Sequence, residues 1–158
     1  MSLLPFFEWC EATALGEAIR DSLWLFPVIE CVHLLALALI GGAVLIVDLR
    51  LLGLGLRRQP VAQIARDAQP WLIGGFVVIV VTGILLFLSE SIKCYYSPPF
   101  WCKMTFLPLA ALFALTVRRK VAAADESRVG PLWGKLVALV SLGLWFGVGF
   151  SGRWIAFY

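Results

Sequence analysis

Four long apolar stretches constrain this chain more than any other feature of its sequence. They run from about residue 23 to 47, 71 to 88, 100 to 117 and 132 to 150, and none carries a charge at its centre. Each is near or above the roughly 20 residues that a helix needs to cross the hydrocarbon core of a bilayer. Of the 158 residues, 61% are hydrophobic and 15% charged, which is more apolar surface than a soluble domain can bury. The sequence therefore predicts an all-α integral membrane four-helix bundle, with residues 1–158 as a single transmembrane domain and a kink at Pro108 in the third span.

The N-terminal segment predicts an additional helix on the membrane surface. Apolar residues recur at helical spacing over residues 3–20, and acidic residues occupy the other faces. A secretory signal would begin with basic residues, whereas the early charges here are Glu8, Glu11 and Glu17. We therefore expect an N-terminal interfacial amphipathic helix.

Lysine and arginine residues predict the orientation in the membrane. Nine fall in the two connections that join spans one to two and three to four, and four fall at the opposite ends: Arg50, Arg57, Arg58, Arg66, Arg118, Arg119, Lys120, Arg128 and Lys135 against Arg20, Lys93, Lys103 and Arg153. The positive-inside rule then places both termini outside a bacterial inner membrane, with tryptophans and Tyr158 at the lipid interfaces. Membrane lipids are the expected partners, and a net charge of +3 is too small and scattered for a nucleic-acid groove.

Glu30 and His33 are the clearest ionisable pair within a span. Three residues apart on a helix, they share one face, and Leu37, Gly41 and Asp48 continue that face toward the cytoplasmic end. Ionisable groups inside a span are costly and usually face the bundle or a cavity. These two residues are therefore the first candidates for function.

Several roles are open to this pair. His33 could be an axial ligand of haem b or a ligand of a metal ion, with Glu30 orienting its ring and Met104 as a second ligand. It could equally form a buried hydrogen-bonded pair with Glu30, held by Lys103, Arg153 or a tryptophan N–H. A third role is the handling of a proton or a substrate.

The remaining charged residues near the span ends have structural interpretations beside functional ones. Asp48 and Arg50 could anchor the first span at the cytoplasmic surface, or contact a lipid headgroup or substrate. Lys103 could extend toward the interface, and Arg153 could do the same or pair with Glu30. Arg118, Arg119 and Lys120 are most simply positive-inside residues.

The cysteines and glycines leave further alternatives. Cys94 and Cys102 lie in one outer loop, where an oxidising periplasm would favour a disulfide, although both could be free buried thiols. No C-x-x-C pair supports a metal site made from cysteines. Glycines at helical spacing in spans two and four suit close helix contacts, within the chain or in a homo-oligomer.

Several segments resemble a family of small bacterial membrane proteins of unknown function. They are SLWLFPVIECVHLLALALIGGAVLIVDLRLLGLGLR, FWCKM and LWFGVGFSGRWIAFY, with Glu30–His33, Asp48–Gly53, Lys103–Met104 and the terminal G-R-W-I-A as the most specific parts. The resemblance implies a four-span inner-membrane protein. More distantly, His33 followed by small residues, with Lys103 at the start of a later span, resembles the copper-resistance D family and the haem-binding membrane protoporphyrinogen oxidases.

The sequence thus favours a small inner-membrane redox protein that binds a haem, a porphyrin or a metal through His33. One alternative is a non-catalytic subunit that oligomerises or serves as scaffold in a larger membrane complex. Another is a transporter of a small solute or ion, using Glu30, His33 and Asp48 as a polar line.

Overall fold

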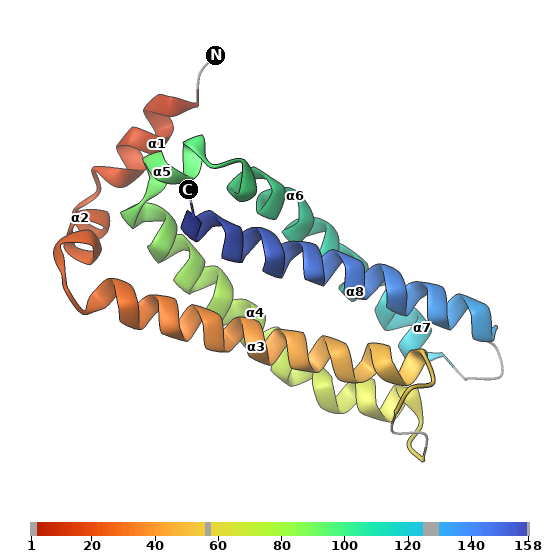
Figure 1. Ribbon diagram of the computed structural model, residues 1–158. Coiled ribbons are helices and arrows are strands. Elements are labelled where there is room, and N and C mark those ends of the chain that lie inside the picture. The colour runs from red at the N-terminus through yellow and green to blue at the C-terminus, as the bar shows by residue number, and fades with distance from the viewer. Residues whose placement is uncertain (1–2, 56–57, 125–129, 158) are drawn as a thin grey trace.

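The computed structural model describes residues 3–55, 58–124 and 130–157, and all regular elements in these ranges are helical (Figure 1). Arg57, Arg128 and Tyr158, which the sequence analysis used, lie outside the described residues. The elements are α1 (Leu4–Glu11), α2 (Ala14–Asp21), α3 (Leu25–Leu51), α4 (Val61–Ser89), α5 (Ser91–Tyr96), α6 (Pro98–Phe113), the π-helix η1 (Ala114–Arg118), α7 (Arg119–Ala123), α8 (Pro131–Trp154) and the 3-10 helix η2 (Ile155–Phe157).

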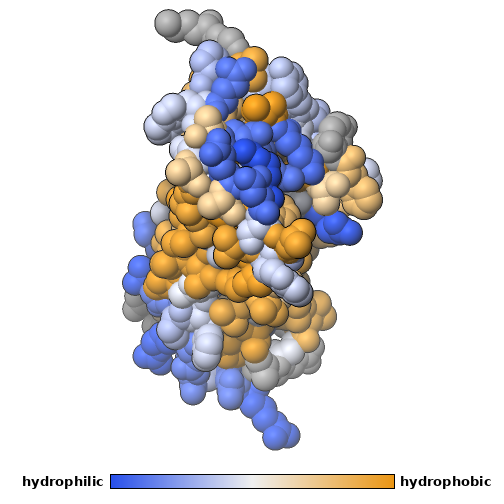
Figure 2. Space-filling view, turned by 90° about the vertical axis from the view of Figure 1, so that its left-hand side faces the viewer, coloured by the Kyte–Doolittle hydropathy of each residue, from blue (hydrophilic) through white to orange (hydrophobic). Residues whose placement is uncertain are grey.

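Four helical segments are long and apolar enough to cross a membrane: Leu25–Leu51, Val61–Ser89, Pro98–Ala123 and Leu132–Phe157. They pack together, which confirms the predicted all-α four-helix bundle. A hydrophobic band crosses the middle of the face shown in Figure 2, with hydrophilic groups above and below it. This distribution is the one expected for a chain whose central solvent is lipid.

Helix α4 begins ten residues before the predicted apolar stretch at Trp71. The added turns are amphipathic: Val61 and Ile64 are buried, whereas Arg66 and Asp67 are exposed. The buried pair packs with residues of α3 and α7 in one core cluster at this end of the bundle. Hydropathy alone misses such turns because their charged face lowers the average although their other face is in the core.

The packing order of the long helices is α4, α3, α8 and α6. Helix α3 contacts both α4 and α8, and α8 contacts α6 (Figure 1). The central helix α3 presents a continuous buried face, whose middle is filled by the apolar residues Ala36, Ile40 and Val44 together with Ile79 of α4. Two polar residues, His33 and Asp48, lie on the same buried face on either side of this apolar cluster.

The N-terminal segment forms two short helices, so the prediction of one helix over residues 3–20 was wrong. Thr13 separates them, because its extended backbone ends the first helix and its hydroxyl accepts a hydrogen bond from the Gly16 N–H at 3.2 Å. Helix α1 packs on α5, and α2 packs on α4. Glu11 also accepts a 2.6 Å hydrogen bond from the Ile92 N–H, so the segment is attached to the bundle end.

Helix α6 continues through Pro108, and the departure from α-helical geometry comes later, at the π-helix η1. A π-helical turn contains an extra residue and therefore changes the direction of the side chains that follow. Arg118, at the end of η1, is buried, whereas Arg119 and Lys120 are exposed. The turn thus directs one of three consecutive basic residues into the bundle.

Candidate functional site

His33 is buried on α3 and faces α4. It is 8% exposed, and its Nδ1 lies 2.8 Å from the Oγ1 of Thr82. The next residue on α4 is Gly83, where a Cβ atom would come within 3.4 Å of the imidazole Cε1. The imidazole ring thus lies in van der Waals range of the α4 backbone at Gly83, and Thr82 holds the orientation of the ring.

The hydrogen bonds of Thr82 bear on which imidazole nitrogen carries the proton. Its Oγ1 lies 2.7 Å from the Val78 carbonyl oxygen, to which its single proton can be donated. With the proton placed there, the hydroxyl accepts from the Nδ1 of His33. In a neutral ring of this tautomer, Nε2 has the lone pair that a ligand or a proton acceptor needs.

Lys103 of α6 brings a positive charge to the same layer of the bundle. Its Nζ would lie 3.7 Å from a Cβ at Gly152 of α8, and its charge acts on both His33 and Cys94. The side chain is partly buried and has no hydrogen bond or ion pair within the described part of the chain. Lys103 thus lies against α8, on the same side of the bundle as His33 and Cys94.

Three other predicted members of this site lie elsewhere. Glu30 is exposed and forms no hydrogen bond or ion pair with the described residues, because the buried face of α3 ends at His33, one turn below it. Met104 is 48% exposed on α6. Arg153 is exposed and places its guanidinium 5.1 Å from the Phe157 ring centroid instead of pairing with Glu30.

A second polar centre lies at the opposite end of α3. Asp48 is fully buried, and its Oδ1 accepts a 2.8 Å hydrogen bond from the Nε of Arg118. The Nη2 of the same guanidinium lies 3.3 Å from the Val44 carbonyl oxygen and 3.5 Å from that of Ala43. Asp48 is thus an ionic anchor, as one interpretation held, but it joins α3 to η1 inside the bundle instead of lying at the surface.

Two residues of α8 add polar atoms beside this ion pair. The hydroxyl of Ser141 faces the Asp48 carboxylate, although neither Ser141 Oγ nor Asp48 Oδ2 has a hydrogen bond of good geometry. The Nε1 of Trp145, one turn along, is also buried without a partner. Arg50 is separate from this centre and donates a 2.9 Å hydrogen bond to the Gln59 carbonyl, which ties the connection after α3 to the helix end.

All four cysteines are free thiols, so the predicted Cys94–Cys102 disulfide is not formed. Cys94 is buried under α1, whereas Cys102 is exposed on the following helix α6. Burial raises the pKa of the Cys94 thiol to about 11, and the Glu90 carboxylate adds to this rise against the opposing charges of Lys103 and Lys93. Cys94 is therefore an inert thiol at neutral pH.

One comparison with known proteins assigns the chain to a family. Residues 6–158 match the model of a family of unknown function, DUF6644. The chain belongs to this family. No curated protein and no solved structure matches it, and the comparisons thus give no support to the likeness to copper-resistance D proteins or protoporphyrinogen oxidases.

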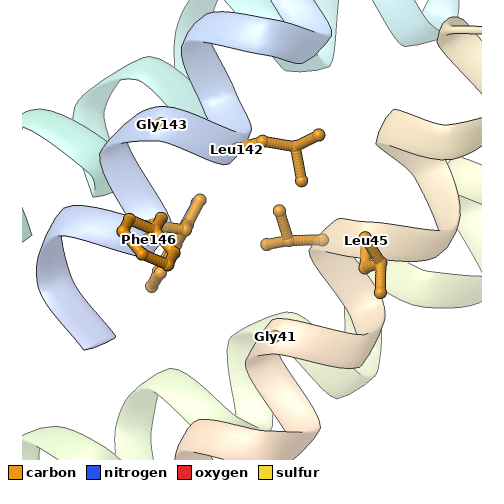
Figure 3. A pocket seen from close by; sticks show the side chains of 7 residues that line it. Gly41, Leu45, Leu142, Gly143 and Phe146 are labelled. Carbon is orange, nitrogen blue, oxygen red and sulfur yellow. The ribbon is translucent and has the colours of Figure 1, made fainter. Parts of the chain in front are cut away.

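Two open apolar grooves in the described part of the chain are lined by residues other than His33. One, of about 570 Å³, lies between α3 and α8 and is lined by Gly41, Leu45, Leu142, Gly143 and Phe146, with Val44 and Trp145 (Figure 3). The other, of about 520 Å³, lies between α3 and α4 and has polar residues at one end. Within the described residues no three His, Cys, Asp or Glu side chains form a group that could hold a metal ion.

The sequence analysis missed two functional candidates of this family member. Thr82 is an ordinary residue for a span, and only its position opposite His33 gives it a role. Arg118 was counted with its basic neighbours. The signal that could have found it is Asp48, because a carboxylate on the buried face of a span requires a partner of opposite charge.

Proposed function

We propose that this membrane protein binds an anionic porphyrin of the haem type through the Nε2 of His33. The observation that carries the proposal is the Val78–Thr82–His33 hydrogen-bond chain, which holds the ring in place and suits the neutral tautomer with its lone pair on Nε2. Histidines that ligate haem or metal commonly have their other nitrogen bound in this way. Haem would supply redox chemistry, and this chain would supply the ligand, its orientation and the surrounding charge.

The charge of the site favours a porphyrin over a bare metal ion. Lys103 repels a divalent cation but would attract a propionate carboxylate of haem. Because Met104 is 48% exposed, we take His33 as the protein ligand of the iron. Since His33 is 8% exposed, binding would require movement of side chains in this layer and should stabilise the fold through that new contact.

The test is a titration of the purified apoprotein with haemin in detergent, followed by the Soret band and by thermal unfolding. We expect a saturable red-shifted Soret band for the wild type and its loss in His33→Ala. Thr82→Val should weaken binding about 10- to 100-fold, the range typical for loss of a group that orients a ligand. Glu30→Gln is the matched control, since this exposed carboxylate should leave the titration unchanged.

Esterified haemin separates the role of Lys103 from that of His33. Lys103→Met should weaken haemin binding but leave the dimethyl ester unaffected, because the ester has no carboxylate to pair with the lysine. Wild-type and His33→Ala proteins that give the same titration would refute the proposal, as would a Lys103 effect that is equal for both ligands.

We also propose that the protein resides in a bacterial inner membrane with both termini outside. The described N-terminal helices and the end of α8 lie at the same end of the bundle (Figure 1). Most of the basic residues lie at the other end, in the helix ends and connections between α3 and α4 and between η1 and α8. Labelling of intact cells with a membrane-impermeant thiol reagent tests this orientation. A cysteine placed at Glu8 should react and one at Gln63 should not.

A further inference from the structure

The cavity between α3 and α4 differs from the cavity between α3 and α8 in its polar end. Its walls are apolar and half of their residues are small, namely Ala38, Gly42, Ala43 and Ala68, and Gln59 and Asp67 line it as well. The cavity between α3 and α8 has no charged lining residue. A groove with apolar walls and an acidic end is complementary to an amphipathic molecule that carries a cationic group.

The polar and apolar parts of this groove lie at the membrane depths that a lipid headgroup and its acyl chains occupy. Asp67 is exposed and lies one turn before Trp71, where the apolar stretch of α4 begins. Along α3 the lining runs from Ile46 to Ala38, a rise of about 12 Å into the apolar part of the helix. The acidic end therefore lies at headgroup level and the apolar walls lie at the level of acyl chains.

We propose that this groove, lined by residues of α3, α4 and Gln59, is a specific site for an aminophospholipid. The ammonium of the headgroup pairs with the Asp67 carboxylate, and one acyl chain lies against Gly42 and its small neighbours. Phosphatidylethanolamine carries this ammonium, whereas phosphatidylglycerol lacks it.

Gly42 and Gly41 provide a matched pair of variants. A Cβ at either glycine would meet no atom within 4 Å, so both positions accept a larger side chain. Gly42 lines the proposed lipid groove and Gly41 lines the other cavity. Leucine at position 42 should therefore fill the lipid groove, and leucine at position 41 should leave it open.

The experiment reconstitutes the full chain in vesicles of equal phosphatidylethanolamine and phosphatidylglycerol, extracts it in mild detergent, and measures retained lipids by native mass spectrometry. We expect wild type and Gly41→Leu to retain phosphatidylethanolamine preferentially, and Gly42→Leu to lose most of it. Asp67→Asn should retain lipid but with the preference reduced several-fold. Thermal unfolding in detergent checks that all variants are folded.

Three results would overturn the proposal. Equal phosphatidylethanolamine retention by Gly42→Leu and Gly41→Leu would show that the lipid lies elsewhere. An unchanged headgroup preference in Asp67→Asn would remove the role of the carboxylate. A dimer that Gly42→Leu dissociates would identify a second copy of this chain as the occupant. None of these results bears on haemin binding at His33, so the two proposals are tested separately.

Discussion

Removal of the Arg118 side chain is the perturbation whose magnitude follows most directly from the structure. Arg118→Met keeps much of the apolar stem but leaves Asp48, which is fully buried, without its 2.8 Å partner. Breaking a buried ion pair from one side costs about 3–5 kcal/mol, because the remaining charge has neither water nor a counterion. The two carbonyls of α3 near Nη2 lose a donor as well. We therefore expect a loss at the upper part of this range.

The measurement is reversible unfolding in mixed detergent micelles, followed by circular dichroism. Arg119→Met is the control, since Arg119 is the exposed neighbour of the same residue type, and it should change the free energy of unfolding by less than about 0.5 kcal/mol. The double variant Asp48→Leu with Arg118→Met should recover most of the loss, because it removes both charges together.

The size of the measured loss in unfolding free energy distinguishes a buried ion pair from an ordinary hydrogen bond between helices. Ordinary hydrogen bonds between membrane helices average about 0.6 kcal/mol, because the unfolded chain in the membrane also finds partners. If Arg118→Met lowers the free energy of unfolding by only that amount, or by no more than Arg119→Met does, the assignment of a stabilising buried ion pair is refuted. A double variant as unstable as the single one would instead show that the carbonyl contacts, and not the charge pair, carry the effect.

Three further outcomes are expected. Gly16→Ala should loosen α2 from α4 and increase protease cleavage near Thr13, because a Cβ at Gly16 would overlap the Leu88 carbonyl oxygen, whereas Gly74→Ala, at an open position, should not. In single-cysteine variants, Cys102 should react with maleimide at pH 8 and Cys94 should not. Because the pKa of Cys94 is raised to about 11, only about a thousandth of this thiol is ionised at pH 8. Labelling of Cys94 should therefore increase as the pH rises toward 11. Phe7→Ala should release α1 from the bundle end, since Phe7 is 5% exposed and contacts the rings of Phe87, Tyr95, Phe100 and Trp101, and its loss should lower the melting temperature more than Phe6→Ala does.

The spans were predictable because hydropathy over about 20 residues is a property of the segment itself and needs no knowledge of its neighbours. The site was only partly predictable for the opposite reason. Helical periodicity places Glu30 and His33 on one face, and this much is correct. The packing of α4 and α8 on α3 determines how much of that face is buried. The buried residues of α3 begin at His33, so Glu30 is not among them.

Arg118 illustrates a second limit. A regular helix through residues 98–123 would direct its side chains by the 3.6-residue period, but the π-helix Ala114–Arg118 shifts the residues that follow it. No pattern in the sequence distinguishes Arg118 from Arg119 and Lys120. The requirement of Asp48 for a buried cation is the one physical constraint that selects among them, and it operates only once the helices are packed.

The two polar centres on α3 are separated by an apolar layer, and this separation bears on what the bundle can do. His33 and Asp48 are 15 residues apart, which is a rise of about 22 Å along the helix. Between them Ala36, Ile40, Val44 and Ile79 form a buried cluster, with Ile40 completely inaccessible. A charged solute would lose its hydration there without gaining a polar partner, so the polar line that transport requires is interrupted. The same layer keeps the centres chemically independent: the ion pair of Asp48 joins α3 to η1 at one end, and the ring of His33 lies against Thr82 at the other.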